Sequence, residues 1–176
     1  KVVVKVLESK TVSSNYTLDE DMEVGDLVVK NAATLNLNGH TLTVHGSISI
    51  ENNSYLKINK GYLKCYGSFQ IDRYGYLYMT NANDYVWING NVNWDSAYSG
   101  GNYLYAGNME IRGNFVHTNS SYAFTSKEDF CIVLSGAKPQ SISFGNLRSY
   151  INILELNNYS EEGVTFQGVI QAKKVI

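Results

Sequence analysis

The sequence predicts an all-β protein, a right-handed parallel β-helix (a solenoid) of about seven coils, with 21–23 residues and three short strands in each coil. Two observations predict this fold. The first is that the segment from Ala33 to Arg73 contains two copies of one pattern, offset by 21 residues, and each copy holds three short alternations of apolar and polar residues. Alternation with a period of two is typical of half-buried strands, and a strand unit that recurs every ~20–50 residues is typical of a solenoid.

The second observation is that glycine recurs in phase with this pattern. The glycines that follow an apolar-x-apolar pair are 21 or 23 residues apart: Gly25, Gly46, Gly67, Gly90, Gly113 and Gly136. We expect a backbone corner with positive φ at each of them, since glycine adopts that conformation without steric cost. An antiparallel sandwich also has many short strands, but it does not require a near-constant period, so we favour the β-helix, with the usual right-handed connections.

Three strands are expected in a fixed order within each coil. The first strand carries the inward pairs Leu35/Leu37, Leu56/Ile58, Leu77/Met79 and Leu104/Ala106. The second strand ends just before the corner glycine, and the third strand follows that glycine. Residues two apart point to the same face of a strand, so these pairs should form interior columns. We expect one β-helix domain over 1–176, with an N-terminal cap region at 1–21, coils at 22–166 and a C-terminal end at 167–176.

Composition argues against several classes of partner. The formal net charge is −2, so we expect no nucleic-acid partner, which would need a basic surface. No apolar run approaches the ~20 residues of a membrane span, so we expect no membrane association. Cys65 falls in an interior column and Cys131 on the opposite phase of its strand, so we expect no disulfide between them. We also expect a monomer.

Aromatic residues gather at the outward positions of the first two strands, mainly in three coils. The first strand should present Tyr55, Tyr76 and Tyr103 in one column and Lys57, Tyr78 and Tyr105 in the next, with Tyr85 and Trp87 on the second strand and Tyr98 in the inserted segment 95–102. An extended exposed aromatic patch is typical of a binding surface, so we expect these nine residues to bind a ligand. Stacked aromatic ladders also stabilise parallel sheets, so a structural stalk or adhesin domain is an alternative.

A polysaccharide is the ligand that this surface suits best. Sugar rings offer an apolar face for stacking and hydroxyls for hydrogen bonds to the neighbouring Asn, Gln, Lys and Asp side chains. Rings on alternate coils would lie ~9.6 Å apart, a repeat that a β-1,4-linked chain could follow. Single-stranded nucleic acid also stacks on aromatic rings, but it needs a positively charged groove. We therefore predict a non-catalytic carbohydrate-binding module for xylan first, and for cellulose or another β-glucan second.

An enzyme is the competing hypothesis, because right-handed β-helices also host polysaccharide lyases and hydrolases that act on pectin-like substrates. Such a site needs paired carboxylates, or calcium with a basic residue. The candidate is the column Glu51, Asp72 and Asp95 at the corner after the third strand, which is also a weak candidate for calcium. We expect no catalytic residues and no cofactor, with calcium at this column as the alternative. No Ser-His-Asp or Cys-His set is evident around the histidines His40, His45 and His117.

A family resemblance supports the carbohydrate hypothesis. The unit NLNGHTLTVHG and the segment VLSGAKPQSISFGN, followed by YINILELNN and GVTF, resemble repeated β-helix regions in secreted proteins of plant-fibre-degrading Firmicutes. β-Helix carbohydrate-binding modules attached to glycoside hydrolases, and the cellulose-adhering tāpirins, are similar in kind. The resemblance covers about 22–166 and rests on structural motifs. It implies plant cell-wall binding in an extracellular or cell-surface location, by a module of a larger glycoside hydrolase or surface protein. It implies no particular binding residue.

Overall fold

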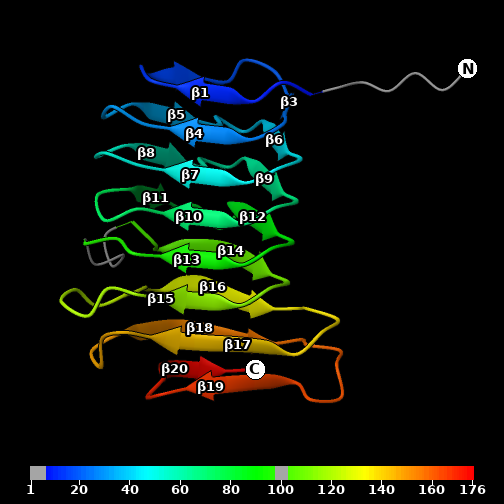
Figure 1. The fold of residues 1–176 in the computed structure, drawn as a ribbon, viewed down its shortest axis with the longest axis vertical. Helices are drawn as coiled ribbons and strands as arrows, with labels where there is room; N and C mark the ends of the chain where they lie inside the picture. The colour runs from blue at the N-terminus through cyan, green and yellow to red at the C-terminus, as the bar shows by residue number, and fades with distance from the viewer. Residues whose placement is uncertain (1–6, 98–102) are drawn as a thin grey trace, which may run out of the picture.

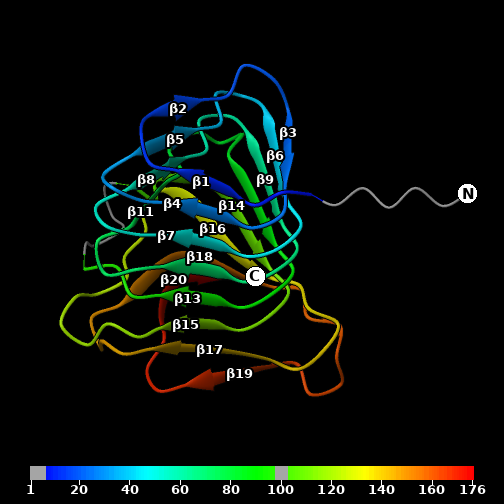
Figure 2. The same ribbon diagram turned by 45° about the horizontal axis from the view of Figure 1, so that its top comes forward.

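The computed structural model describes residues 7–97 and 103–176, and it confirms the predicted fold class. Every regular element in these ranges is a strand, and the strands form three parallel sheets. The chain winds from the N-terminal coil at the top of Figure 1 to the C-terminal coil at the bottom, as a right-handed parallel β-helix of about seven turns. The three stacks of strands separate clearly when the top is tilted toward the viewer (Figure 2).

Each sheet collects strands from successive coils. Sheet A contains β1 (Lys10–Val12), β4 (Leu27–Val29), β7 (Ile48–Ile50), β10 (Phe69–Ile71), β13 (Val92–Trp94), β15 (Phe115–His117), β17 (Gln140–Phe144) and β19 (Val164–Gln167). Sheet B contains β2 (Tyr16–Thr17), β5 (Thr34–Asn36), β8 (Tyr55–Lys57) and β11 (Tyr76–Tyr78). Sheet C contains β3 (Met22–Val24), β6 (Thr41–Val44), β9 (Tyr62–Cys65), β12 (Tyr85–Ile88), β14 (Ala106–Ile111), β16 (Asp129–Leu134), β18 (Tyr150–Leu156) and β20 (Gln171–Val175).

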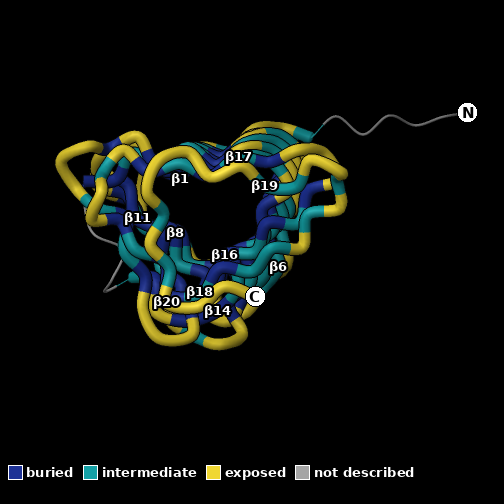
Figure 3. Tube along the Cα trace, turned by 90° about the horizontal axis from the view of Figure 1, so that it is seen from below, coloured by how far each residue is buried: buried dark blue, intermediate teal, exposed yellow. Residues whose placement is uncertain are grey.

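The core consists of columns of apolar side chains that stack along the axis, as the sequence predicts. On sheet B, Leu35 pairs with Leu56 and Leu56 pairs with Leu77, and each is at most 1% exposed. Seen along the axis, the coils have a roughly triangular outline, and the buried residues lie on its inner side (Figure 3). Full burial of a leucine side chain contributes about 1.5–3 kcal/mol, so these repeated columns are a major source of stability.

The corner glycines do not have the positive φ that we expected. Among the described glycines, positive φ occurs at Gly39, Gly107, Gly163 and Gly168 only. The corner glycines are required for space instead. Gly67 N donates a hydrogen bond to Gly46 O at 2.8 Å, and a Cβ atom added to Gly67 would lie 2.5 Å from that same oxygen. Glycine therefore recurs because the backbones of successive coils touch at this corner.

Sheet B ends at β11, and the register changes there. We expected Leu104 to stack on Leu77, but Leu104 pairs with Met79, two residues further along. The physical reason is a local bulge: Tyr105 N and Ala106 N both donate hydrogen bonds to Met79 O, at 2.8 and 3.2 Å. The chain then enters sheet C directly, where β14 and β16 have 6 residues and β12 has 4.

The stacked strands extend beyond the predicted coil range at both ends. Within 1–21, β1 pairs with β4 and β2 pairs with β5. Within 167–176, β20 pairs with β18. The ends of the described chain are thus further rungs of the same parallel sheets, because their backbone amides and carbonyls continue the hydrogen-bonded ladders.

Both cysteines are free and buried; Cys65 lies in the interior as predicted, whereas Cys131 was expected on the opposite phase of its strand. Burial disfavours the thiolate and raises the pKa of Cys65 to about 12 and that of Cys131 to about 11, so both behave as inert apolar side chains. No helix that could span a bilayer is found in residues 7–97 and 103–176.

Candidate functional site

Four tyrosines on and beside sheet B pack against one another: Tyr55, Tyr76, Tyr78 and Tyr103, hereafter the sheet B cluster. The rings of Tyr55 and Tyr76 stack with centroids 4.5 Å apart and an interplanar angle of 18°. The ring of Tyr103 packs against those of Tyr76 and Tyr78, and its centroid lies 5.3 Å from that of Tyr76 and 4.6 Å from that of Tyr78. Tyr76 is consequently only 7% exposed, although the sequence predicted an open ring there. Tyr76 is thus the buried ring of this cluster, whereas Tyr55, Tyr78 and Tyr103 are half-buried.

Lys57 and Tyr78 meet, as expected, at the edge of the sheet B cluster. The Lys57 Nζ atom lies 5.2 Å from the centroid of the Tyr78 ring. The two residues line a surface hollow of about 330 Å³ together with Asn36, Asn59 and Thr80. Burial raises the pKa of Tyr78 to about 12, and the neighbouring Tyr103 and Tyr55 add to this rise. The tyrosine therefore stays a neutral hydroxyl at physiological pH, able to donate or accept a hydrogen bond.

Tyr105 does not join this cluster in the structure. The register change pairs Leu104 with Met79, so Tyr105 does not stack on Tyr78 as the sequence predicted. Tyr105 is 45% exposed and stands apart from the column. Tyr98 lies outside the described residues. We predicted two adjacent columns, Tyr76/Tyr103 and Tyr78/Tyr105. This prediction is wrong, because Tyr103 contacts both Tyr76 and Tyr78.

A second aromatic group lies on sheet C and contains Tyr62, Tyr66, Tyr85 and Trp87, hereafter the sheet C face. Tyr62 and Tyr85 are paired across β9 and β12, and their rings meet edge-to-face, 5.0 Å apart at 85°. Tyr66 and Trp87 also meet edge-to-face, 5.2 Å apart at 72°. Tyr66 is 47% exposed. Trp87 and Tyr85 lie where the sequence predicted, partly exposed on this outer surface.

Sequence reasoning left Tyr62 and Tyr66 out of the predicted site, although it placed them in outward columns. The signal that could have found them is their register. Tyr62 is the neighbour of Tyr85 on the adjacent rung, and Tyr66 follows Lys64, the neighbour of Trp87. Side chains on adjacent rungs are ~4.8 Å apart and must touch when both are large.

Charged groups adjoin the sheet C face. The Lys64 Nζ atom lies 4.9 Å from the centroid of the Tyr62 ring. On the next rung, the Tyr85 hydroxyl donates a hydrogen bond to Glu110 Oε2. Burial and this hydrogen bond raise the pKa of Tyr85 well above its usual range, so its proton remains on the phenol. The sheet C face therefore combines apolar rings with a carboxylate acceptor and neutral hydroxyls.

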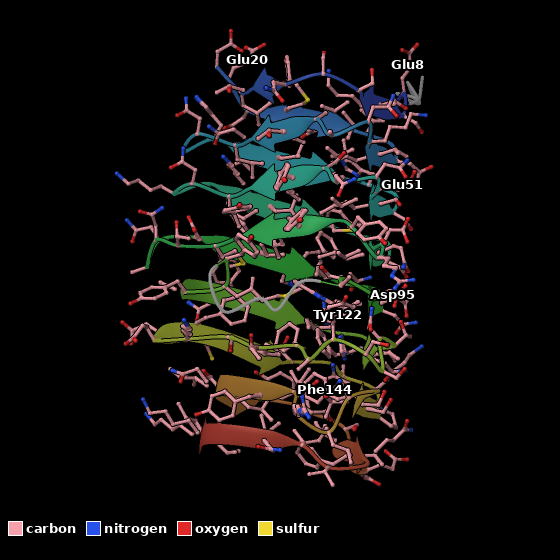
Figure 4. The ribbon with its side chains drawn as sticks, turned by 90° about the vertical axis from the view of Figure 1, so that its left-hand side faces the viewer. Glu8, Glu20, Glu51, Asp95, Tyr122 and Phe144 are labelled. Atoms are coloured by element: carbon pink, nitrogen blue, oxygen red, sulfur yellow. The ribbon has the colours of Figure 1, made fainter. Side chains whose placement is uncertain are left out.

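The acidic column follows one corner of the solenoid, where Figure 4 shows Glu51 and Asp95 along the same edge. Each carboxylate accepts a hydrogen bond from a nearby donor. Glu51 accepts from Ser49 Oγ at 2.8 Å, Asp72 from the Arg73 backbone N–H at 2.8 Å, and Asp95 from Thr118 Oγ at 3.2 Å. In the described ranges, no three or more His, Cys, Asp and Glu side chains are grouped closely enough to hold a metal ion. The calcium alternative at this column gains no support.

The histidines have separate environments. His40 Nδ1 lies 3.6 Å from Asp21 and His45 Nε2 lies 3.7 Å from Glu23, both near the surface. His117 is 1% exposed in the interior of sheet A, as the sequence predicted, and among the described residues neither ring nitrogen has a hydrogen-bond partner. Burial lowers its pKa to about 4, so the ring is neutral at physiological pH.

No protein-family model matches the chain, and neither a curated protein nor a solved structure matches it. The functional proposal below therefore rests on the fold and on the residues of the chain itself.

Proposed function

We propose that this chain is a non-catalytic carbohydrate-binding module whose sheet C face binds a β-1,4-linked polysaccharide of plant cell walls, with xylan preferred over cellulose and other β-glucans. One observation carries the proposal. The sheet C face is an aromatic surface on a parallel sheet: Tyr66 is 47% exposed, and Tyr62, Tyr85 and Trp87 are each half-buried. All four rings therefore keep surface available for a sugar.

The orientation of Trp87 supports this choice of face. Tyr66 stacks on His45 with an interplanar angle of 12°, so these two rings follow the solenoid axis. Trp87 is turned 72° from Tyr66 and leaves that stack. Tryptophan and tyrosine are also the side chains most often found at the centres of binding surfaces, because they are large, rigid and amphipathic.

The spacing of the fold supports an extended glycan. Adjacent rungs are ~4.8 Å apart, so groups two rungs apart are separated by ~9.6 Å along a straight axis. A β-1,4-linked chain that lies along this axis would meet equivalent rungs at a regular interval. Such a module would act outside the cell as part of a larger glycoside hydrolase or surface protein, as a monomer.

The experiment is affinity electrophoresis of the chain in gels that contain xylan, β-glucan, mannan or pectin. We expect retardation by xylan, and we expect Trp87→Ala to weaken it about tenfold, a loss of roughly 1.4 kcal/mol. Binding should change little with salt, because no ion pair drives it. The matched control is Tyr78→Ala in the sheet B cluster, with Gln70→Ala on sheet A as a second control. Full binding by Trp87→Ala together with loss in Tyr78→Ala would place the ligand on sheet B instead.

A further inference from the structure

A surface groove continues the sheet C face toward the C-terminus. It has a volume of about 350 Å³, and its lining includes Tyr85, Asn108, Glu110, Ser135, Glu155 and Tyr159. Tyr85 belongs to both the sheet C face and the groove. Trp87 pairs with Glu110 on the next rung, Glu110 with Val133, and Val133 with Glu155. The two carboxylates are therefore two rungs apart on one line, with a valine between them.

Hydrogen bonds hold both glutamates in position. Glu110 Oε1 accepts from Ser135 Oγ at 2.6 Å, and Glu110 Oε2 accepts from the Tyr85 hydroxyl. Glu155 Oε1 accepts from Asn157 Nδ2 at 2.5 Å. In the part of the chain that the structure describes, no donor is paired with Glu155 Oε2. These carboxylates are orientated acceptors, and at least one oxygen remains for a ligand.

No cation neutralises the two glutamates within the described residues. The salt bridges there join His40 to Asp21 and His45 to Glu23. Lys174 pairs with Ile153 on the last rung of sheet C, and it forms no ion pair with either glutamate. The groove thus presents two negative charges next to aromatic rings. Two fixed negative charges repel an anionic ligand, whereas they do not repel a neutral one.

We propose that this groove is a second subsite for the glycan and that it sets the specificity of the module, a proposal that rests on the function proposed above. Glu110 and Glu155 accept hydrogen bonds from sugar hydroxyls, while Trp87 and Tyr85 contact the ring that precedes them. Charge-assisted hydrogen bonds of this kind are stronger than neutral ones. The ligand is therefore a neutral β-1,4-linked glycan, and glycans that carry uronic acids are rejected.

Isothermal titration calorimetry with two probes tests this proposal: xylohexaose, which is neutral, and a galacturonate hexamer, which is anionic. The variants are Glu155→Gln and Glu110→Gln, which keep the shape and remove one charge each. The matched control is Glu51→Gln, the same change at the acidic corner beside sheet A. Thermal unfolding of each variant reports whether the fold is intact.

We expect Glu155→Gln and Glu110→Gln each to weaken xylohexaose binding three- to tenfold and to narrow the preference for xylohexaose over the galacturonate hexamer. Glu51→Gln should change neither. If Trp87→Ala weakens xylohexaose binding while both groove variants keep the affinity and the preference of the parent, the subsite is overturned and the proposed function stands. If the parent protein binds no neutral glycan at all, the proposed function itself fails, and the subsite fails with it.

Discussion

The sheet B cluster and the sheet C face are built from the same repeats, but their rings are packed differently. In the sheet B cluster, Tyr55 and Tyr76 stack face to face at 4.5 Å and 18°. On the sheet C face, Tyr62 and Tyr85 meet at 85°. The two groups also differ in exposure, since Tyr76 is 7% exposed between Tyr55 and Tyr103, whereas Tyr66 is 47% exposed although it stacks on His45. The first group is mainly a structural ladder, and the second keeps ring surface toward solvent.

The difference has a cause in the backbone. Sheet B stops at β11, and the chain returns after the 98–102 segment so that Tyr103 contacts both Tyr76 and Tyr78. Sheet C continues through eight strands. An aromatic side chain at an outward position is thus a surface for ligand only where no later segment returns to cover it.

The largest effect that separates the two regions should come from Tyr76→Ala. Removing a ring that packs between Tyr55 and Tyr103 leaves a cavity, so we expect a loss of about 2–4 kcal/mol in the free energy of unfolding. Xylan affinity of the folded protein should stay unchanged. Urea unfolding and affinity electrophoresis measure the two quantities. Tyr105→Ala, at a ring 45% exposed, is the control with little effect on stability. If Tyr76→Ala kept the stability of the parent but lost xylan affinity, the sheet B cluster would be the binding surface and not a structural ladder.

A smaller effect is expected at Gly67, the corner that joins sheet C to sheet A beside Tyr66. The side chain in Gly67→Val would start 2.5 Å from Gly46 O, and relieving this contact should cost on the order of 1–3 kcal/mol of unfolding free energy. The control is Gly39→Asn, because Gly39 has a φ of +86° and open space around it, and asparagine tolerates that conformation. We expect the melting temperature to fall far more in Gly67→Val than in Gly39→Asn. Equal shifts would mean that backbone conformation, and not contact between coils, selects the corner glycine.

The third prediction concerns the core residue His117, whose protonation should make stability depend on pH without affecting either aromatic region. The folded pKa of His117 is about 4 and its ordinary value is 6.5, so the unfolded state binds more protons in this window. This contribution to stability is complete above about pH 6.5, falls as the pH drops, and is lost fully near pH 4. Between pH 7 and 5 we expect a loss of about 2 kcal/mol from this residue.

His117→Phe should remove that part of the pH dependence, since the ring lies against the rings of Phe124 and Phe144 and phenylalanine carries no proton. Urea unfolding of parent and variant at pH 7 and at pH 5 measures this pH dependence. Xylan affinity per folded molecule should be the same in parent and variant at both values. An identical slope of stability with pH in the two proteins would show that another group carries the acid sensitivity.

Much of the fold was accessible from the sequence because the repeat leaves a single register that buries its apolar residues. The pairs Leu42 with Leu63 and Trp87 with Glu110 lie where the period places them. The register after the insert was not accessible, because Met79 O accepts two amides and moves Leu104 by two residues. The role of the corner glycines was also misread, since a recurrent glycine is consistent with positive φ and with close backbone contact alike.

Two other features depend on groups brought together from different coils. Asp84 is 1% exposed, and its carboxylate accepts hydrogen bonds from the backbone N–H groups of Thr80, at 2.7 Å, and Lys60, at 2.5 Å. Nothing in the local sequence marks it as buried. The groove residue Glu155 had a weak signal, because the predicted match of Ile132/Leu134 with Leu154/Leu156 places Val133 beside it.

The amino-acid sequence by itself determined the period and, in the coils before the insert at 95–102, the inward columns and the sheet to which the outward residues belong. These properties follow from alternation with a period of two in a repeat of near-constant length, which allows only one way to exclude water from the apolar side chains. The tertiary structure alone decided which outward rings are exposed, where sheet B ends and which carboxylates share a groove. Exposure of a ring depends on how far the side chains of the neighbouring rungs cover it and on where the chain returns after an insert. Both are set by packing between residues that are distant in the chain.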